Sequence, residues 1–290
     1  MSATHDDIDW ATRLTAMRRS DALQHESLQQ VAARLAANLG PDPVVVDAGC
    51  GSGGMSAALA SVLRHNGGGR LVLVDATEEL LEAAQKAASA AGGETVTVTT
   101  VNADVGTASS VSRLPSADLV WASGMVHHLP DQQAGVATLA DLLAPGGTLA
   151  LAEGGLNQKT LPWDLGVGRP GLEDRLHAAH NAWFHDLRSA MDGVVDMPYG
   201  WTTALARAGL EEPTSFGYLV EHPAPISDTV LEHVVEHLAW MAEILHDYLA
   251  SDDRDTLAEL TDPAGSHYLG ARDDLFLLSA RSVYTARRPH

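Results

Sequence analysis

The sequence predicts an α/β fold in which a mostly parallel β-sheet is covered by helices on both faces. Between residues 44 and 153, strand-like and helix-like segments alternate along the chain. The strand-like runs are almost continuously apolar, which is typical of parallel strands buried on both faces. The first of these runs, VVVDAGCGSGG at 44–54, ends in a glycine-rich turn of the kind that lies against a nucleotide-like ligand.

The predicted elements follow from periodicity and from turn residues. Residues 8–39 repeat Leu, Met, Val and Ala at helical spacing and predict one or two helices that end at NLGPDP. The glycine-rich segments HNGGGR, AGG and APGG then separate helices from strands. We expect strands at 44–47, 71–75, 95–101, 118–122 and 148–153, and helices at 54–64, 77–91 and 131–143.

After residue 153 the alternation is lost. A long connection rich in proline and glycine, GGLNQKTLPWDLGVGRPG, precedes predicted helices at 172–192 and 199–209, a strand at 213–220, helical sequence at 227–262 and a last strand, LFLLSARSVYTAR. We interpret residues 1–40 as an N-terminal helical segment and 41–290 as one domain. Its helical cap insertions are expected at about 154–195 and 222–270.

Composition excludes several classes of partner. The chain has 290 residues, 45% of them apolar, which is enough for a substantial core. With 38 acidic and 18 basic residues the formal net charge is −20, so we expect no nucleic-acid partner. We also expect no membrane partner and a cytoplasmic location, because no apolar run approaches about 20 residues and Cys50 is the single cysteine.

The glycine turn fits more than one kind of nucleotide-like ligand. Gly49, Gly51 and Gly54 match the dinucleotide pattern G-x-G-x-x-G, so these residues are compatible with a nicotinamide enzyme. Asp75 ends the second strand, where a carboxylate can accept both ribose hydroxyls of either ligand. Asp104, in VNADV after the third strand, is placed to accept from an adenine amino group.

These segments, followed by ADLVWASGMVHHLPD and LAPGGTLALAE, together resemble the class I S-adenosylmethionine-dependent methyltransferases of the small-molecule type. The resemblance covers residues 40–155 and, more loosely, the last strand. It implies a Rossmann-like doubly wound sheet with an antiparallel last strand and S-adenosyl-L-methionine as cofactor. The cofactor-binding residues that it implies are Asp47, Gly49, Gly51, Asp75, Ala76, Asp104, Val105 and Ser123.

The segment HHLPD supplies the candidate base. His127 and His128 follow the fourth strand at the edge where open α/β sheets bind ligands, and Glu153 ends the neighbouring strand. A histidine beside a carboxylate suits proton removal, because the acid holds the tautomer and stabilises the imidazolium. We favour His127, since related small-molecule enzymes with this double-histidine segment place a base at the first position. The alternatives are that one histidine only caps the next helix, or that no base is needed.

Two further groups of residues could bind a metal or the cofactor. His233 and His237 lie four residues apart on a predicted helix and could bind a metal, but no third ligand follows at a defined spacing, so we expect none. An arginine of the N-terminal helix, among Arg13, Arg18 and Arg19, could pair with the methionine carboxylate of the cofactor, or these residues form a solvated face.

The sequence therefore predicts methyl transfer from S-adenosylmethionine to a small-molecule acceptor, in bacterial natural-product or other secondary metabolism. The fourth strand ends ASGM and lacks the Asn/Asp-Pro-Pro-Tyr motif of enzymes that methylate base amines or glutamine side chains. The alternatives are a cyclisation or decarboxylation that uses the same cofactor and fold, and a nicotinamide oxidoreductase. A homodimer is the assembly considered.

Overall fold

The computed structural model describes residues 13–106 and 113–290, which form two compact units. The first, here called the sheet unit, comprises the described part of Ile8–Gly155 together with Asp192–Tyr218 and Arg281–His290. The second, here called the helical unit, comprises Leu156–Met191 and Leu219–Ala280 among the described residues. The predicted division into residues 1–40 and a domain with cap insertions stays a prediction.

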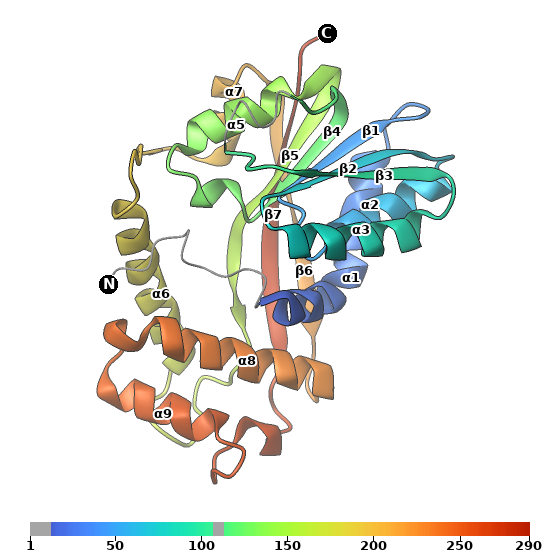
Figure 1. The fold of residues 1–290 in the computed structure, drawn as a ribbon. Coiled ribbons are helices and arrows are strands. Elements are labelled where there is room, and N and C mark those ends of the chain that lie inside the picture. Colours follow the sequence, from blue (N-terminus) through green and yellow to red (C-terminus); the bar gives the residue numbers. More distant parts are fainter. Residues whose placement is uncertain (1–12, 107–112) are drawn as a thin grey trace. The chain divides into compact units, whose positions relative to one another are not determined.

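The predicted alternation of strands and helices is confirmed (Figure 1). The strands are β1 Val44–Ala48, β2 Gly69–Asp75, β3 Val96–Asn102, β4 Ala117–Ser123, β5 Leu143–Lys159, β6 Glu211–His222 and β7 Leu277–Arg287. The helices are α1 Leu14–Ala36, α2 Gly54–His65, α3 Glu78–Gly92, α5 Gln132–Asp141, α6 Leu172–Ser189, α7 Trp201–Arg207, α8 Asp228–Ile244 and α9 Ser251–Thr261, with 3-10 turns η3 Val126–His128, η4 His246–Tyr248 and η5 Leu269–Ala271.

The seven strands form one sheet in the order β3-β2-β1-β4-β5-β7-β6. The pairs β1–β2, β2–β3, β1–β4 and β4–β5 are parallel, and the last strands are antiparallel. This is the predicted doubly wound, mostly parallel sheet. The strand order reverses between β1 and β4, and open α/β sheets bind their ligands outside the carboxyl ends of the strands at such a switch point.

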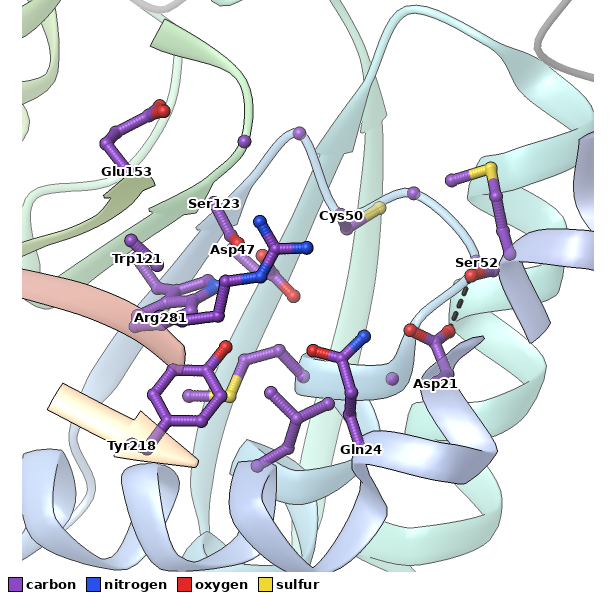
Figure 2. A pocket seen from close by; sticks show the side chains of 18 of the residues that line it. Asp21, Gln24, Asp47, Cys50, Ser52, Trp121, Ser123, Glu153, Tyr218 and Arg281 are labelled. Atoms are coloured by element: carbon purple, nitrogen blue, oxygen red, sulfur yellow. Dashed lines mark hydrogen bonds between the residues drawn. The ribbon is translucent and has the colours of Figure 1, made fainter. Parts of the chain in front are cut away.

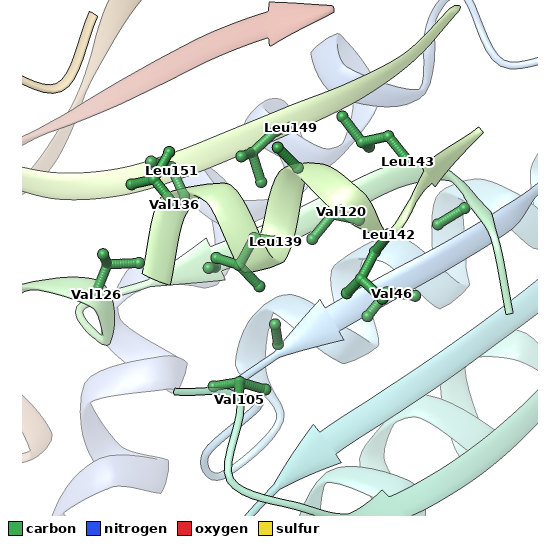
Figure 3. Close-up of a cluster of buried hydrophobic side chains, with 14 of the residues drawn as sticks. Val46, Val105, Val120, Val126, Val136, Leu139, Leu142, Leu143, Leu149 and Leu151 are labelled. Atoms are coloured by element: carbon green, nitrogen blue, oxygen red, sulfur yellow. The ribbon is translucent and has the colours of Figure 1, made fainter. Parts of the chain in front are cut away.

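Alternation along each strand sorts the side chains of the sheet unit into two cores. On one face, valines and leucines of β1, β4 and β5 pack against α5, as Figure 3 shows for Val46, Val120, Leu139 and Leu149. On the other face, the alternate positions pack under α1, α2 and α3, and the fully buried Trp121 belongs to this second core. Asp47 lies one residue from Val46 and therefore faces the α1 side.

Two elements differ from the prediction. Strand β5 begins at Leu143 and ends at Lys159, whereas a strand at 148–153 was expected. The segment APGG was read as a turn, but it forms an irregularity inside the strand, since β4 pairs with both Leu143 and Thr148. The helical sequence at 227–262 is divided into α8, η4 and α9. One helix, α1, occupies the described part of the N-terminal segment, and residues 1–12 lie outside the described residues.

The helical unit consists mainly of α6, α8 and α9. Arg175 on α6 makes a two-pronged ion pair with Asp253 on α9, with both nitrogen–oxygen distances at 2.8 Å. The positive charge of Arg175 thereby compensates the buried carboxylate of Asp253, and it holds the pKa of that carboxyl below its usual value. In the described part of the chain, no helix combines the length and the apolar character needed to cross a bilayer.

Candidate active site

The candidate site is a pocket of the sheet unit at the carboxyl ends of β1 and β4, beside residues 152–154 of β5 (Figure 2). Six of the predicted site residues line it together, although they come from three separate segments of the chain. These are Asp47, Gly49, Gly51, Ser123, His127 and Glu153.

The glycine turn is held against β2 by hydrogen bonds. The backbone N–H of Gly49 donates to the carbonyl of Val74 at 2.8 Å. Gly49 and Gly51 have φ values of +72° and +52°, a conformation that side-chain-bearing residues rarely adopt. The carboxylate of Asp75 accepts from Gly51 N through one oxygen and from Thr77 N through the other, both at 2.9 Å. Asp75 therefore stabilises the turn and is not among the residues that line the pocket. Its contact with a ribose stays a prediction.

Asp47 is a carboxyl group almost without access to water, with 1% of its surface exposed. It accepts one hydrogen bond, from Ser56 Oγ at 2.6 Å. Burial raises the pKa of Asp47 to about 7, and the negative charges of Asp75 and Asp21 add to the effect. The charged form of Asp47 is thus disfavoured until a positive charge enters the pocket.

An acid on α1 lies at the first turn of α2. Ser52 Oγ donates to Asp21 Oδ2 at 2.5 Å, and the backbone N–H of Gly54 also donates to Asp21. A Cβ atom at Gly54 would overlap this carboxylate, so the helix must begin with glycine for α1 to come so close. The amino end of a helix carries a partial positive charge, and in this protein a side-chain carboxylate already occupies it. Burial raises the pKa of Asp21.

His127, in η3 after β4, and Glu153, inside β5, form a hydrogen-bonded pair. The distance from His127 Nδ1 to Glu153 Oε2 is 2.6 Å, and Glu153 Oε1 accepts from the backbone N–H groups of Met125 and Val126 at 3.1 and 2.8 Å. Three donors thus compensate the burial of Glu153, of which 1% is exposed. A carboxylate can only accept, so Nδ1 carries the proton and Nε2 of the neutral ring holds the lone pair. Glu153 lies inside β5, whereas it was expected to end that strand.

His128 has a different position from His127. Its ring packs against that of His127 with centroids 3.9 Å apart, and it is not part of the pocket lining. Ser123, at the end of β4, is exposed and lines the pocket. The geometry therefore favours His127 over His128 as the histidine that meets a ligand.

The predicted adenine-binding residues lie outside the lining of this pocket. Asp104 Oδ1 accepts from Gly106 N at 2.8 Å and so closes a local turn. The side chain of Val105 is buried in the core under α5, and Ala76 is exposed after β2. These three residues are not brought into the pocket, and their contacts with an adenosine stay predictions.

Sequence reasoning missed several lining residues. Helix α1 contributes Met17, Asp21, Gln24 and Leu28, whereas Arg13, Arg18 and Arg19 are not among the lining residues. Strands β6 and β7 contribute Tyr218 and Arg281. The signal for Arg281 was present in the sequence, because it lies two residues before the buried Val283 and hence on the core side of its strand.

The remaining histidines of interest lie in the helical unit. The rings of His233 and His237 stack with centroids 6.2 Å apart, and His233 Nε2 lies 3.2 Å from Gln158 Oε1. Within residues 13–106 and 113–290, no group of three or more His, Cys, Asp or Glu is arranged to hold a metal ion. The expectation that no metal is bound stays a prediction.

Comparisons with known proteins assign this fold. Residues 46–149 match the family model described as a methyltransferase domain. A putative methyltransferase from Bacillus halodurans is 16% identical, with 91% of this chain and 98% of that chain covered and a TM-score of 0.50. The YcgJ protein from Bacillus subtilis is also 16% identical, with 92% and 100% covered and a TM-score of 0.50. A comparison with curated proteins finds no match.

The chain has the fold of the class I S-adenosylmethionine-dependent methyltransferases, and its residues 46–149 match the model of a methyltransferase domain. The resemblance inferred from the sequence is thereby confirmed. The glycine turn and the His127–Glu153 pair both line the pocket at the switch point of this fold.

Proposed function

We propose that this protein binds S-adenosyl-L-methionine in the pocket and transfers its methyl group to a small-molecule acceptor. One observation carries the proposal: the glycine turn of the methyltransferase domain and the His127–Glu153 pair line the same pocket. A cofactor held by the turn would therefore share the pocket with His127.

The charges of the pocket suit this cofactor. S-adenosylmethionine carries an ammonium and a sulfonium group, and the pocket offers the carboxyl groups of Asp21, Asp47 and Glu153. A cation near Asp47 would favour the ionised form that burial disfavours. The residues present therefore fit the cofactor.

The same charges argue against a nicotinamide dinucleotide. In dinucleotide-binding folds the pyrophosphate lies at the amino end of the helix that follows the glycine turn. Here the carboxylate of Asp21 occupies that end of α2, hydrogen-bonded to Ser52 and Gly54. A pyrophosphate in this position would meet a fixed negative charge.

The chain's own residues would position the acceptor and remove its proton. When bound, S-adenosylmethionine supplies a methyl group that is already activated for in-line displacement. Glu153 keeps the proton of His127 on Nδ1, so Nε2 can take a proton from a hydroxyl group or a carbon acid of the acceptor. The imidazolium that forms is stabilised by Glu153 at 2.6 Å.

We assign the acceptor to the small molecules of secondary metabolism, since the ASGM ending of β4 lacks the motif of base-amine and glutamine methylation. The test is to incubate the protein with S-adenosylmethionine and a panel of small acceptors, and to measure S-adenosylhomocysteine and products heavier by about 14 Da. Formation of both is expected. Cofactor binding with conversion of an acceptor but without S-adenosylhomocysteine would show the cyclase or decarboxylase alternative instead.

A further inference from the structure

We propose that Arg281 and Tyr218 form a carboxylate-binding site inside the pocket. The inference deepens the proposed function and rests on it, because it names an anionic group on one of the molecules that bind there. The site lies on β7 and β6, the two strands of the sheet farthest from β3.

The strand register directs both side chains to the α1 side of the sheet. Val283, two residues after Arg281, is fully buried in the core under α1. Phe216, two residues before Tyr218, packs against the same core, and the guanidinium of Arg34 lies 3.8 Å from the centre of its ring. Since alternate residues of a strand share a face, Arg281 and Tyr218 face this side as well. Both line the pocket (Figure 2).

The pocket contains more than one acid, but each already has a partner. Asp21 is bonded to Ser52, Asp47 to Ser56, and Glu153 to His127. Among the described residues, no carboxylate lies within ion-pair distance of Arg281. The guanidinium group of Arg281 is exposed to the pocket, and its hydrogen-bond donors have no partner among residues 13–106 and 113–290.

Tyr218 supplies a further donor beside Arg281. Strands β6 and β7 are neighbours, and a Cβ atom at Gly217 would lie 3.5 Å from the carbonyl oxygen of Arg281, so Tyr218 and Arg281 are adjacent across the two strands. Burial raises the pKa of Tyr218, while the charge of Arg281 acts in the opposite direction. The phenol therefore keeps its proton at neutral pH. The guanidinium offers donors only, and the neutral hydroxyl can donate as well as accept. A carboxylate, which only accepts, is complementary to these donors.

Two molecules could bring this carboxylate. One is the cofactor, whose methionine end carries a carboxylate. No arginine of α1 is among the lining residues that could pair with it. The other is the acceptor, because across the sheet Arg281 on β7 lies beyond the strands of His127 and Glu153 as seen from the glycine turn on β1. The chemistry is the same in both cases.

The first arm of the test concerns the cofactor. Calorimetry would compare S-adenosylhomocysteine with 5′-methylthioadenosine, which lacks the amino-acid end, on the wild type, Arg281→Met and Tyr218→Phe. If the site holds the methionine carboxylate, Arg281→Met should weaken S-adenosylhomocysteine about 10- to 100-fold and leave methylthioadenosine unchanged, with a smaller loss in Tyr218→Phe. Arg281→Lys should restore part of the affinity.

The second arm concerns the acceptor. Benzoate and its neutral isostere benzamide would be titrated, with ligand-observed NMR, into the protein with and without saturating S-adenosylhomocysteine. If the site holds an acceptor carboxylate, benzoate should bind the wild type, and this binding should be lost in Arg281→Met. The binding of benzamide should be the same in both proteins. Arg287→Met is the matched control, since Arg287 lies on the same strand but outside the pocket lining.

Either selective loss supports the proposal and identifies the source of the carboxylate. Equal weakening of S-adenosylhomocysteine and methylthioadenosine, or no difference between the wild type and Arg281→Met in both arms, would overturn it. A wild type that binds no S-adenosylhomocysteine would instead contradict the proposed function. Benzoate binding to the ligand-free wild type and to Arg281→Met would still test the carboxylate site.

Discussion

Replacing Asp47 by asparagine should make the protein more stable at alkaline pH and poorer at binding its cofactor. Asparagine keeps an oxygen that can accept from Ser56 Oγ but cannot become charged. Burial raises the pKa of Asp47 from 3.8 to about 7. The folded state therefore holds a proton that the unfolded chain releases. Ionisation of Asp47 in the folded wild type lowers its free energy of unfolding.

The sign and size of the effect follow from this pKa. Stability due to Asp47 is fully present below pH 3.8 and is lost as the pH rises through about 7. Since one pKa unit corresponds to about 1.4 kcal/mol, the whole loss is about 4 kcal/mol, of which about 2–3 kcal/mol falls between pH 5 and pH 8. The free energy of unfolding of Asp47→Asn, relative to the wild type, should rise by that amount over this interval.

Denaturant unfolding of both proteins at several pH values measures this difference. Because titrating groups distant from residue 47 act equally on both proteins, the comparison isolates Asp47 together with its coupling to Asp75 and Asp21. Ser56→Ala serves as a second variant, since removing a hydrogen bond that lowers the pKa of Asp47 should extend the loss of stability to higher pH. Parallel pH profiles of Asp47→Asn and the wild type between pH 5 and pH 8 would refute the reasoning.

Three further predictions concern binding and turnover. His127→Ala should lower turnover about 10²–10⁴-fold with little change in the affinity for S-adenosylhomocysteine. Glu153→Gln should lower turnover by a smaller factor. Near-normal turnover of His127→Ala in a steady-state assay would mean that positioning of the acceptor alone suffices. Asp75→Ala should weaken cofactor binding about 10- to 100-fold, because the turn loses the acceptor of Gly51 N; unchanged affinity by calorimetry would exclude this role. Incubation with a chelator should leave methyl transfer unchanged, and activity that is lost and then returns with Fe(II) or Zn(II) would contradict the expectation of no metal.

The sequence predicted the parts of the site that are local in the chain. The turn from Asp47 to Gly51 and the segment with His127 each carry a recognisable pattern of residue types, and parallel strands place their ends at one edge of the sheet. The pairing of His127 with Glu153 could be expected for the same reason, because β4 and β5 are neighbours.

The sequence could not show the contacts that depend on packing between distant elements. Asp21 reaches the first turn of α2 only because α1 packs closely at Gly54, and nothing in the sequence near Asp21 indicates this. Arg281 was overlooked although its strand register placed it on the core side. The extent of β5 was misjudged because the glycines around residue 146 suggested a turn, whereas pairing with β4 continues on both sides of them.

Calorimetric titration of the wild-type protein with S-adenosylhomocysteine and, separately, with NAD⁺ tests the central claim most directly. The glycine turn is compatible with both ligands, but the carboxylates of Asp21 and Asp47 favour the one that carries a positive charge and no pyrophosphate. We predict one site that binds S-adenosylhomocysteine, no binding of NAD⁺, and a loss of affinity in Asp47→Asn. Binding of NAD⁺ with no binding of S-adenosylhomocysteine would contradict the account.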